Sequence, residues 1–353
     1  MLMTGVAAQA ATIYTDGDKS FSFGMGISTS TTNGSGEKLS LDDMRIYTSG
    51  TIAKGYGFTF NMVRDAGATD PDAMRVMDAI AQIEMAPSVN FWAGQMLPAF
   101  DRQGLNGPYF SVASGAVYGA GLQGDYPAKF YGRDVGASLW GDIGNFKYQV
   151  GAFNGTPKTA KTGSSPNVDG NKLYSVRLSY AFLDAEPGYY TSGTYFGSKD
   201  IATLGVYYQS QKTGYGTAAS PSDYTGMGAD FLYEKKLGGG GAATLEAGYT
   251  KFNLGDNAVT TPTYTQYYLQ PFQGTSWFIQ PSWYSGFKLG PGALQPYLKY
   301  TKNAPDTGFT AVDYQTDVGL GYIIKGYDTR VFLNYSKPAD KTDVTTLRLQ
   351  MQF

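Results

Sequence analysis

The chain has no cysteine and no histidine among its 353 residues. Their absence excludes a Ser-His or Cys-His nucleophile pair, an imidazole metal site and a thiolate metal site. A mechanism based on carboxylates alone survives, but no spacing in the sequence singles out a carboxylate pair. We therefore expect a protein that is not an enzyme and that uses no cofactor and no metal.

Charged residues and long apolar runs are also scarce. Only 16 % of the residues are charged, against about 25 % in an average soluble domain. No run approaches the roughly 18 apolar residues that a membrane-spanning helix needs. The chain is instead rich in aromatic residues, with 29 Tyr and 20 Phe, which favour strands and the girdles of membrane β-barrels. The net charge of −2 argues against a nucleic-acid partner.

Apolar and polar residues alternate with a period of two along most of the chain, which predicts strands with one apolar and one wet face. In the last stretch Leu347, Leu349 and Met351 fall on one side and Arg348 and Gln350 on the other. We expect sixteen strands, at residues 18–30, 41–53, 56–64, 75–85, 88–97, 132–141, 145–155, 172–183, 200–211, 223–236, 242–254, 276–289, 292–301, 311–324, 329–336 and within 341–353. Strands of this length can cross a bilayer at a tilt. The pattern predicts an all-β fold, a 16-stranded antiparallel transmembrane β-barrel; taken alone, the last stretch also fits an edge strand of a soluble sandwich.

The connections between these strands alternate between tight and long. The even-numbered gaps are mostly short, at residues 54–55, 86–87, 142–144, 237–241, 290–291 and 325–328. The others are mostly longer and polar, which is typical of a barrel with short turns at one end and outer loops at the other. One connection that should be short, at residues 184–199, is long and rich in aromatic residues, and the alternation offers no explanation for it.

The same alternation sorts the charges onto the face opposite the apolar one. The inward charges are predicted to be Arg45, Lys147, Arg177, Lys299, Arg330 and Arg348, with Asp43, Asp78, Glu84, Asp134, Asp230, Glu234, Glu246 and Asp317. Charges of both signs are costly in a dry core unless they are paired, whereas they suit a water-filled lumen. Basic and acidic residues gather on different arcs of the wall, so we expect either a transverse field across the pore or solvated residues with no tuned role. The facing of strand 88–97 stays open, and six aromatic residues are predicted to point outward into the interfacial girdles: Trp277, Trp283, Tyr249, Tyr300, Tyr322 and Tyr335.

The longest connection, residues 98–131, would be the third outer loop. Loops of this length usually carry a function, and its moderate apolarity suits packing against the inner wall. We expect an inward-folded third loop that narrows the pore, with an outer lid as the alternative. The candidate constriction residues are Asp101, Arg102, Asp125, Lys129, Arg133 and Asp134.

The chain begins with MLMTGVAAQAA, in which Ala8-Gln9-Ala10 has the form of an A-x-A cleavage site. We expect residues 1–10 to be the residual tail of a signal peptide and residues 11–353 to be one barrel domain. A short flexible tail is the alternative. An exported barrel of this kind would lie in the bacterial outer membrane.

Five short segments follow one another along the chain: residues 91–98 (FWAGQMLP), 132–136 (GRDVG), 150–155 (VGAFNG), 186–190 (EPGYY) and 199–205 (KDIATLG). In this order they resemble motifs of the phosphate-selective porin O/P family of Gram-negative outer membranes. The first resembles that family's V-G-Q-F-x-x-P stretch, and the second resembles the start of the strand after its long loop. The last strand, ending on Phe353, resembles the closing strand of outer-membrane barrels, in which assembly machinery reads the terminal aromatic residue.

The resemblance implies a homotrimeric porin surrounded by outer-membrane lipid, with an inward third loop and a long middle turn. Family members carry a ladder of arginines and a lysine cluster in the lumen, whereas the inward charges here are of both signs. We therefore expect passive diffusion of small ions and hydrophilic solutes. The alternatives are an anion- or phosphate-specific channel, which would use basic residues near the long loop such as Arg102, Lys129, Arg133 and Arg177, and a plugged structural or adhesive barrel, recognisable by an apolar inward face or an inserted helix.

Overall fold

The structure is a computed structural model that describes residues 10–33, 39–64, 73–112, 132–156, 167, 169–256, 273–306, 313–339 and 341–353. The described residues form one short α-helix, α1 (Arg102–Asn106), a 3-10 turn, η2 (Gly238–Gly240), and eighteen strands. The strands are β1 (Ala11–Asp16), β2 (Lys19–Thr32), β3 (Leu39–Ala53), β4 (Tyr56–Arg64), β5 (Met74–Ala86), β6 (Val89–Met96), β7 (Asp134–Ile143), β8 (Phe146–Phe153), β9 (Leu173–Ala181), β10 (Ile201–Gly216), β11 (Pro221–Lys236), β12 (Ala242–Asn253), β13 (Gly274–Tyr284), β14 (Lys288–Leu289), β15 (Gly292–Pro305), β16 (Tyr314–Lys325), β17 (Thr329–Pro338) and β18 (Val344–Gln352).

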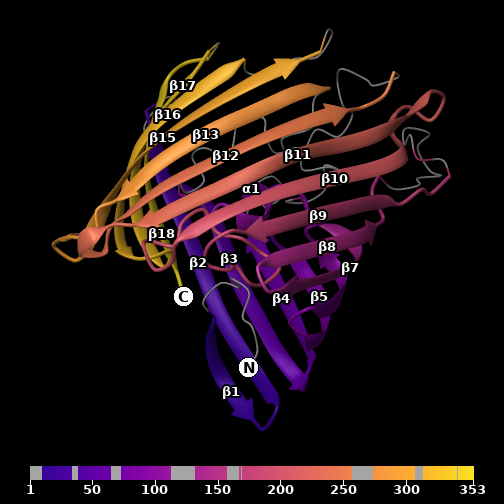
Figure 1. The fold of residues 1–353 in the computed structure, drawn as a ribbon, viewed down its shortest axis with the longest axis horizontal. Helices are drawn as coiled ribbons and strands as arrows, with labels where there is room; N and C mark the ends of the chain where they lie inside the picture. The colour runs from indigo at the N-terminus through magenta and orange to yellow at the C-terminus, as the bar shows by residue number, and fades with distance from the viewer. Residues whose placement is uncertain are drawn as a thin grey trace.

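The strands close into an antiparallel barrel, because the last strand, β18, pairs with β2 (Figure 1). Two positions in the ring are each shared by two strands. β1 pairs with residues 19–23 of β2, and β18 pairs with residues 26–32 along the same edge. β13 and β14 divide one edge of β15 in the same way. The ring of described strands therefore has sixteen positions, which confirms the predicted fold class.

One strand was not predicted. β1 forms a hairpin with β2 through the turn at Gly17, whose φ of 58° is the left-handed conformation that glycine adopts without strain. β1 begins at Ala11, the position predicted to start the barrel domain. Residues 1–9 of the expected signal-peptide tail lie outside the described residues.

Side chains alternate between the outer and inner faces of the wall. Four of the aromatic residues predicted to face outward, Trp277, Trp283, Tyr249 and Tyr335, are exposed, and Tyr300 and Tyr322 alternate with buried neighbours in the same sense. The structure also decides the facing of β6, because Phe91 is exposed whereas Trp92 is buried. Among the described residues, no helix is long and apolar enough to cross a membrane.

The alternation of β5 is interrupted at Met77. A strict period of two would put Met77 on the face opposite the inward Asp78, and therefore outward, but its side chain is only 1 % exposed. The pairing of β4 with β5 shifts register here, so that Asn61 faces Asp78 while the next residue, Met62, faces Val76. A bulge of this kind turns two successive residues toward the same side, and Met77 therefore joins Asp78 on the inside.

Two segments leave the wall and lie inside the barrel. One is residues 97–112, which we call the inserted loop; it follows β6 and contains α1 (Figure 1). The other is residues 184–199 between β9 and β10, which we call the inserted turn. Both carry many buried side chains, among them Leu105 and Tyr109 in the loop and Tyr189 and Thr194 in the turn. The long connection that the sequence pattern could not explain is thus an inward insertion.

Candidate functional site: a lumen crossed by two inserted segments

The inserted loop is shaped by a capped single turn of helix. Asp101 is the N-cap of α1, and its Oδ1 accepts a hydrogen bond from the backbone N–H of Gly104 at 2.5 Å. Burial raises the pKa of the Asp101 carboxyl to about 7, because removal from water disfavours the charged form. The cap fixes the direction of α1, so that Arg102, the first residue of the helix, points into the centre of the barrel.

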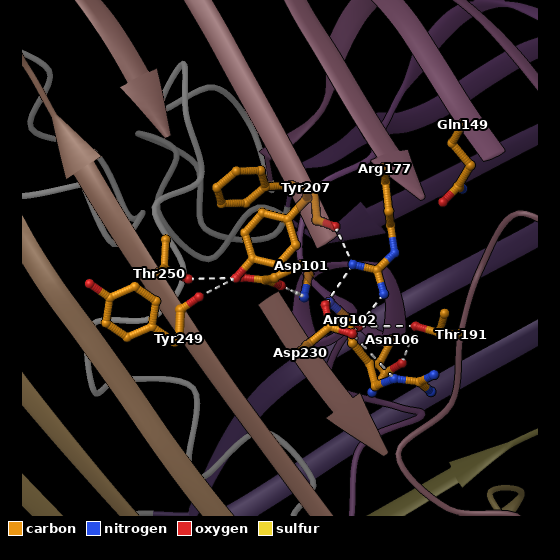
Figure 2. Close-up of polar contacts among 12 residues, drawn as sticks. Asp101, Arg102, Asn106, Gln149, Arg177, Thr191, Tyr207, Asp230, Tyr249 and Thr250 are labelled. Carbon is orange, nitrogen blue, oxygen red and sulfur yellow. Dashed lines mark hydrogen bonds and ion pairs between the residues drawn. The ribbon is translucent and has the colours of Figure 1, made fainter. Parts of the chain in front are cut away.

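Two arginines and one aspartate form the centre of the interior (Figure 2). Arg177 of β9 donates to both carboxylate oxygens of Asp230 on β11, at 2.5 and 2.7 Å, and to the carbonyl of Phe100 at 2.8 Å. Asp230 also accepts the backbone N–H of Arg102 at 3.0 Å. A bidentate arginine–carboxylate pair is among the strongest side-chain interactions. Arg177 and Asp230 therefore hold the inserted loop against the wall at the start of α1.

The Arg102 side chain turns from the wall to the inserted turn. Its terminal nitrogens donate to Glu186 Oε1 at 2.8 Å and to Glu186 Oε2 at 2.5 Å, and one of them also donates to the carbonyl of Ser192 at 2.9 Å. Burial by itself would raise the pKa of Glu186, but the ion pair and hydrogen bonds with Arg102 outweigh it and lower the pKa to about 2. Arg102 and Glu186 thus fasten the two inserted segments to each other.

A second carboxylate fastens the inserted turn to the wall. Glu234 of β11 accepts hydrogen bonds from the Thr194 hydroxyl at 2.7 Å and from the backbone N–H groups of Tyr195 and Gly197 at 2.8 and 2.9 Å. Lys147 of β8 donates to the carbonyl of Glu186 at 2.6 Å. Three of these bonds satisfy backbone groups that would otherwise be buried without a partner, and so the turn keeps a fixed path through the lumen.

The far end of the inserted loop reaches the opposite side of the ring. Arg330 of β17 donates to the carbonyls of Tyr109 and Ser111 at 2.9 and 2.8 Å, and Gln350 of β18 donates to the same Tyr109 carbonyl at 3.2 Å. Between these points Lys299 of β15 donates to Gln103 at 3.0 Å. The inserted loop therefore crosses the lumen from β9 and β11 to β17 and β18.

Space remains on one side of this crossing. A cavity of about 360 Å³ lies between the two inserted segments and the wall formed by β3 to β7, and it extends to β1, β2 and the tight turn at Gly55. We call it the side cavity. Its lining includes Arg45, Asp78, Glu84 and Arg133. No group of three or more Asp or Glu side chains able to hold a metal ion occurs in the part of the chain that the structure describes.

The candidate constriction residues separate into three groups. Asp101 and Arg102 lie inside the barrel, as expected, and organise the inserted loop. Arg133 and Asp134 serve the wall: Arg133 pairs with Asp78 at 3.0 Å, and Asp134 accepts the backbone N–H groups of Gly155 and Val135. Asp125, Lys129 and the rest of the predicted loop from residue 113 to 131 lie outside the described residues.

The predicted lumen charges point inward, but most of their side chains are buried and not exposed to water. Twelve of the fourteen predicted inward charges are at most 8 % exposed; the part-exposed ones are Glu84 and Arg348. Several hold the inserted segments, as described for Arg177, Lys147, Lys299, Arg330, Asp230 and Glu234. The expectation of solvated wall charges is therefore corrected: inserted backbone and side chains replace the water. The predicted field between a basic arc and an acidic arc of the wall is also weaker, since Arg45 pairs with Asp43 and Asp230 pairs with Arg177.

Sequence reasoning missed the residues of the inserted turn. Glu186, Tyr189, Thr191 and Tyr195 all contact interior partners: Tyr189 donates to the carbonyl of Leu97, Thr191 to that of Arg102, and Tyr195 to Glu186. The available signal was the length and aromatic content of residues 184–199 at a position where a tight turn belongs. A long connection that breaks the alternation has to bury its aromatic residues somewhere, and the lumen is the nearest site.

Comparison with known proteins supports the fold. Neither a family model nor a curated protein sequence matches the chain. Solved structures do: OmpT of Vibrio cholerae, expressed in the outer membrane, has a TM-score of 0.59 at 10 % identity and covers 97 % of this chain and 100 % of its own. A mutant of Rh. blastica porin has a TM-score of 0.55 at 12 % identity and covers 95 % of this chain and 100 % of its own.

A trimer form of in-vitro folded OmpT of Vibrio cholerae is similar at a TM-score of 0.55 and 11 % identity, covering 95 % of this chain and 99 % of its own. At this level of identity the likeness shows a shared porin-like barrel fold. The resemblance to the phosphate-selective family is not confirmed by any of these matches.

Proposed function

We propose that the protein is an outer-membrane channel through which small hydrophilic solutes and ions diffuse passively. The outward wall carries exposed apolar and aromatic side chains that suit contact with lipid, such as Leu204, Val206 and Trp277. The inward wall is polar. The observation that carries the proposal is the side cavity, which leaves about 360 Å³ open inside a closed barrel. No covalent step is part of this function, and the proposed protein is not an enzyme.

Two segments, the inserted loop and the inserted turn, would constrict this channel. In this proposal the inserted loop narrows the lumen, and the inserted turn narrows it further from a connection of the opposite parity. Since the two segments meet at Arg102 and Glu186, solute would pass along β3 to β7 instead of through the middle. We expect such a channel to conduct weakly and to discriminate among solutes by size.

The remaining elements of the proposal concern location and assembly. Outer-membrane proteins with this fold, one of them solved in a trimer form, support the outer membrane as the location and a homotrimer as the assembly. Export through a cleaved signal peptide and reading of Phe353 by the barrel assembly machinery belong to the same proposal. β18 places Phe353 at the end of the closing strand, where its backbone pairs with Met25.

A plugged structural barrel is the second candidate, and a specific observation favours it. An inserted helix was the feature expected of a plug, and α1 is such a helix, only one turn long. An anion-specific channel has less support, because Arg177 and Arg133 are bound to the carboxylates of Asp230 and Asp78 and Arg330 is occupied by loop carbonyls. A buried guanidinium that already has its partners offers little to a passing phosphate.

Liposome swelling with neutral solutes of graded size distinguishes these candidates. Vesicles that contain the purified, folded protein should swell in small polyols and more slowly in disaccharides. Vesicles with heat-denatured protein are the control for leakage. Equal impermeability of both preparations to every solute would reject the diffusion channel and favour the plugged barrel.

A further inference from the structure

Four charged residues line the side cavity: Arg45 of β3, Asp78 and Glu84 of β5, and Arg133, the residue before β7. The rest of the lining in the described chain carries no charge, and several of its side chains bear hydroxyl or amide groups. The charge that a solute meets in the cavity therefore depends on which of the four charged side chains are paired.

The two arginines at the cavity are each held by a carboxylate. Arg45 pairs with Asp43 at 2.8 Å, and Arg133 pairs with Asp78 at 3.0 Å. Asp78 also accepts a hydrogen bond from the amide of Asn61 at 2.9 Å. Because the Coulomb energies of two close opposite charges largely cancel at a distance, neither guanidinium offers a passing anion a full positive charge.

Glu84 differs from these pairs. Its side chain is part-exposed, and within the described residues the partner of its carboxylate is the indole N–H of Trp92, which donates to Oε1 at 3.2 Å. An indole supplies a hydrogen bond but no positive charge. No basic side chain in the part of the chain that the structure describes forms an ion pair with Glu84. Glu84 therefore leaves one negative charge facing the side cavity.

The backbone places Glu84 near the end of the barrel that carries the tight turns. Its N–H donates to the carbonyl of Gly55 at 2.7 Å, and Gly55, in the turn between β3 and β4, also lines the cavity. Glu84 lies two residues before the end of β5. A carboxylate at such a place raises the local concentration of cations and lowers that of anions.

We propose that Glu84 makes the channel prefer small monovalent cations over anions. The arginines of the side cavity are already paired, so this carboxylate sets the sign of the charge that an ion meets there. The side-chain oxygens of Ser49, Thr51 and Gln82 line the same cavity, and uncharged oxygens of this kind can replace part of a cation's hydration shell. The inference rests on the proposed function, because it names the class of solute that the channel favours.

Reversal potentials of the detergent-purified, folded protein in planar bilayers, measured across a KCl gradient, test the inference. The wild type should favour K⁺ over Cl⁻ by about fivefold, as for one charge met at about 4 Å in water. Glu84→Gln keeps an acceptor for the Trp92 N–H but removes the charge, so the permeability ratio should fall toward unity. Glu84→Asp keeps the charge and should keep the preference. The control Asp313→Asn removes an exposed carboxylate paired with Lys302 outside the cavity and should match the wild type.

A relocated carboxylate separates the effect of charge from a change of shape. Gln82→Glu in the Glu84→Gln background returns a negative charge to the side cavity and should restore the preference for K⁺. A wild-type ratio near unity, a preference for Cl⁻, or a ratio that Glu84→Gln leaves unchanged would overturn the inference. So would a double variant that stays unselective, because the charge would then not be the cause.

The proposed function fails by a different result. Absence of ionic current from the folded wild type would reject the channel, and the inference with it. A current without preference for K⁺ would reject the inference alone and leave the channel.

Discussion

At the scale of single residues, Arg102 has the most consequential position. Its backbone N–H is held by Asp230, and its guanidinium is held by Glu186 and Ser192. The sequence placed Arg102 in a pore-narrowing loop but could not give its partners, because Glu186 is 84 residues and Asp230 is 128 residues away. Such pairs depend on where whole segments fold, and no local pattern encodes them.

Replacement of Arg102 should loosen both inserted segments. Arg102→Ala leaves the buried Glu186 carboxylate without its counter-charge, a change that typically costs about 3–5 kcal/mol. The barrel itself should persist, because its strand pairing does not involve this side chain. Hydrogen–deuterium exchange should therefore rise in residues 97–112 and 184–199 while the strands stay protected.

The matched control for Arg102 is Lys235→Ala, which removes an exposed pair with Asp200. Exposed pairs contribute about 0–1 kcal/mol, so exchange in the inserted segments should not change. Equal exchange in wild type and Arg102→Ala would contradict the role assigned to Arg102. Exchange of the inserted segments in Arg102→Lys should lie between that of wild type and that of Arg102→Ala, since an ammonium cannot reproduce the two-point contact with Glu186.

The protonation of Asp101 predicts a dependence on pH. Burial raises its pKa from 3.8 to about 7, so the folded loop binds more protons than the free loop between these values. Its stability is then fully present at low pH and is lost as the pH rises through 7. Glu186 behaves in the opposite sense: with its pKa lowered from 4.5 to about 2, its contribution is present above pH 4.5 and is lost only in strong acid.

The inserted loop should therefore be better protected at pH 5 than at pH 8. Asp101→Asn keeps an acceptor for the Gly104 N–H but cannot ionise, so it should reduce this difference. The measurement is hydrogen exchange of residues 97–112 at the two pH values, corrected for the intrinsic pH dependence of exchange. A wild-type loop better protected at pH 8 would contradict the assignment.

At the scale of elements, the strands followed from the sequence and the insertions followed only in part. A period of two, tight turns and a gap parity with one exception can be read from the sequence, and they located all sixteen strand positions to within a few residues. The hairpin of β1 was missed although Gly17-Asp18 is a two-residue hairpin signal, because residues 11–16 were placed in the barrel domain without a strand. The inserted turn was noticed as an exception, but its destination depends on Glu234 and Arg102, which lie on other elements.

Removal of the Glu234 side chain should release the inserted turn. Glu234→Ala leaves the N–H groups of Tyr195 and Gly197 and the Thr194 hydroxyl without acceptors, and each orphaned buried group costs about 1–3 kcal/mol. The turn contains Tyr189, Tyr190, Tyr195 and Phe196 as cleavage sites for chymotrypsin. Cleavage between residues 184 and 199 should appear in the variant and be slow in wild type.

The control for Glu234 is Asp313→Ala, which removes an exposed carboxylate paired with Lys302. It should be cut no faster than wild type. If Glu234→Ala resists chymotrypsin as well as the control does, the turn is held by packing instead, through contacts such as the stack of Tyr189 on Trp92.

At the scale of the whole molecule, two inserted segments enter a closed barrel of sixteen positions. Ion pairs in the middle join these segments to each other and to the wall, and the side cavity lies beside them. This arrangement explains why the inward face is polar and yet buried. Most of its charged side chains bind the inserted segments, and few are left to face a solute. The account predicts a narrow channel whose width depends on two contacts. One is the ion pair of Arg102 with Glu186, and the other is the set of hydrogen bonds between Glu234 and the inserted turn.

Planar-bilayer conductance of the wild type beside the double variant Arg102→Ala/Glu234→Ala tests this claim most directly. The account predicts small, reproducible wild-type steps and clearly larger steps in the double variant, because release of both segments widens the lumen. Wild-type steps as large as those of the double variant would show that the inserted segments do not narrow the channel. No steps from either folded protein would contradict the channel altogether.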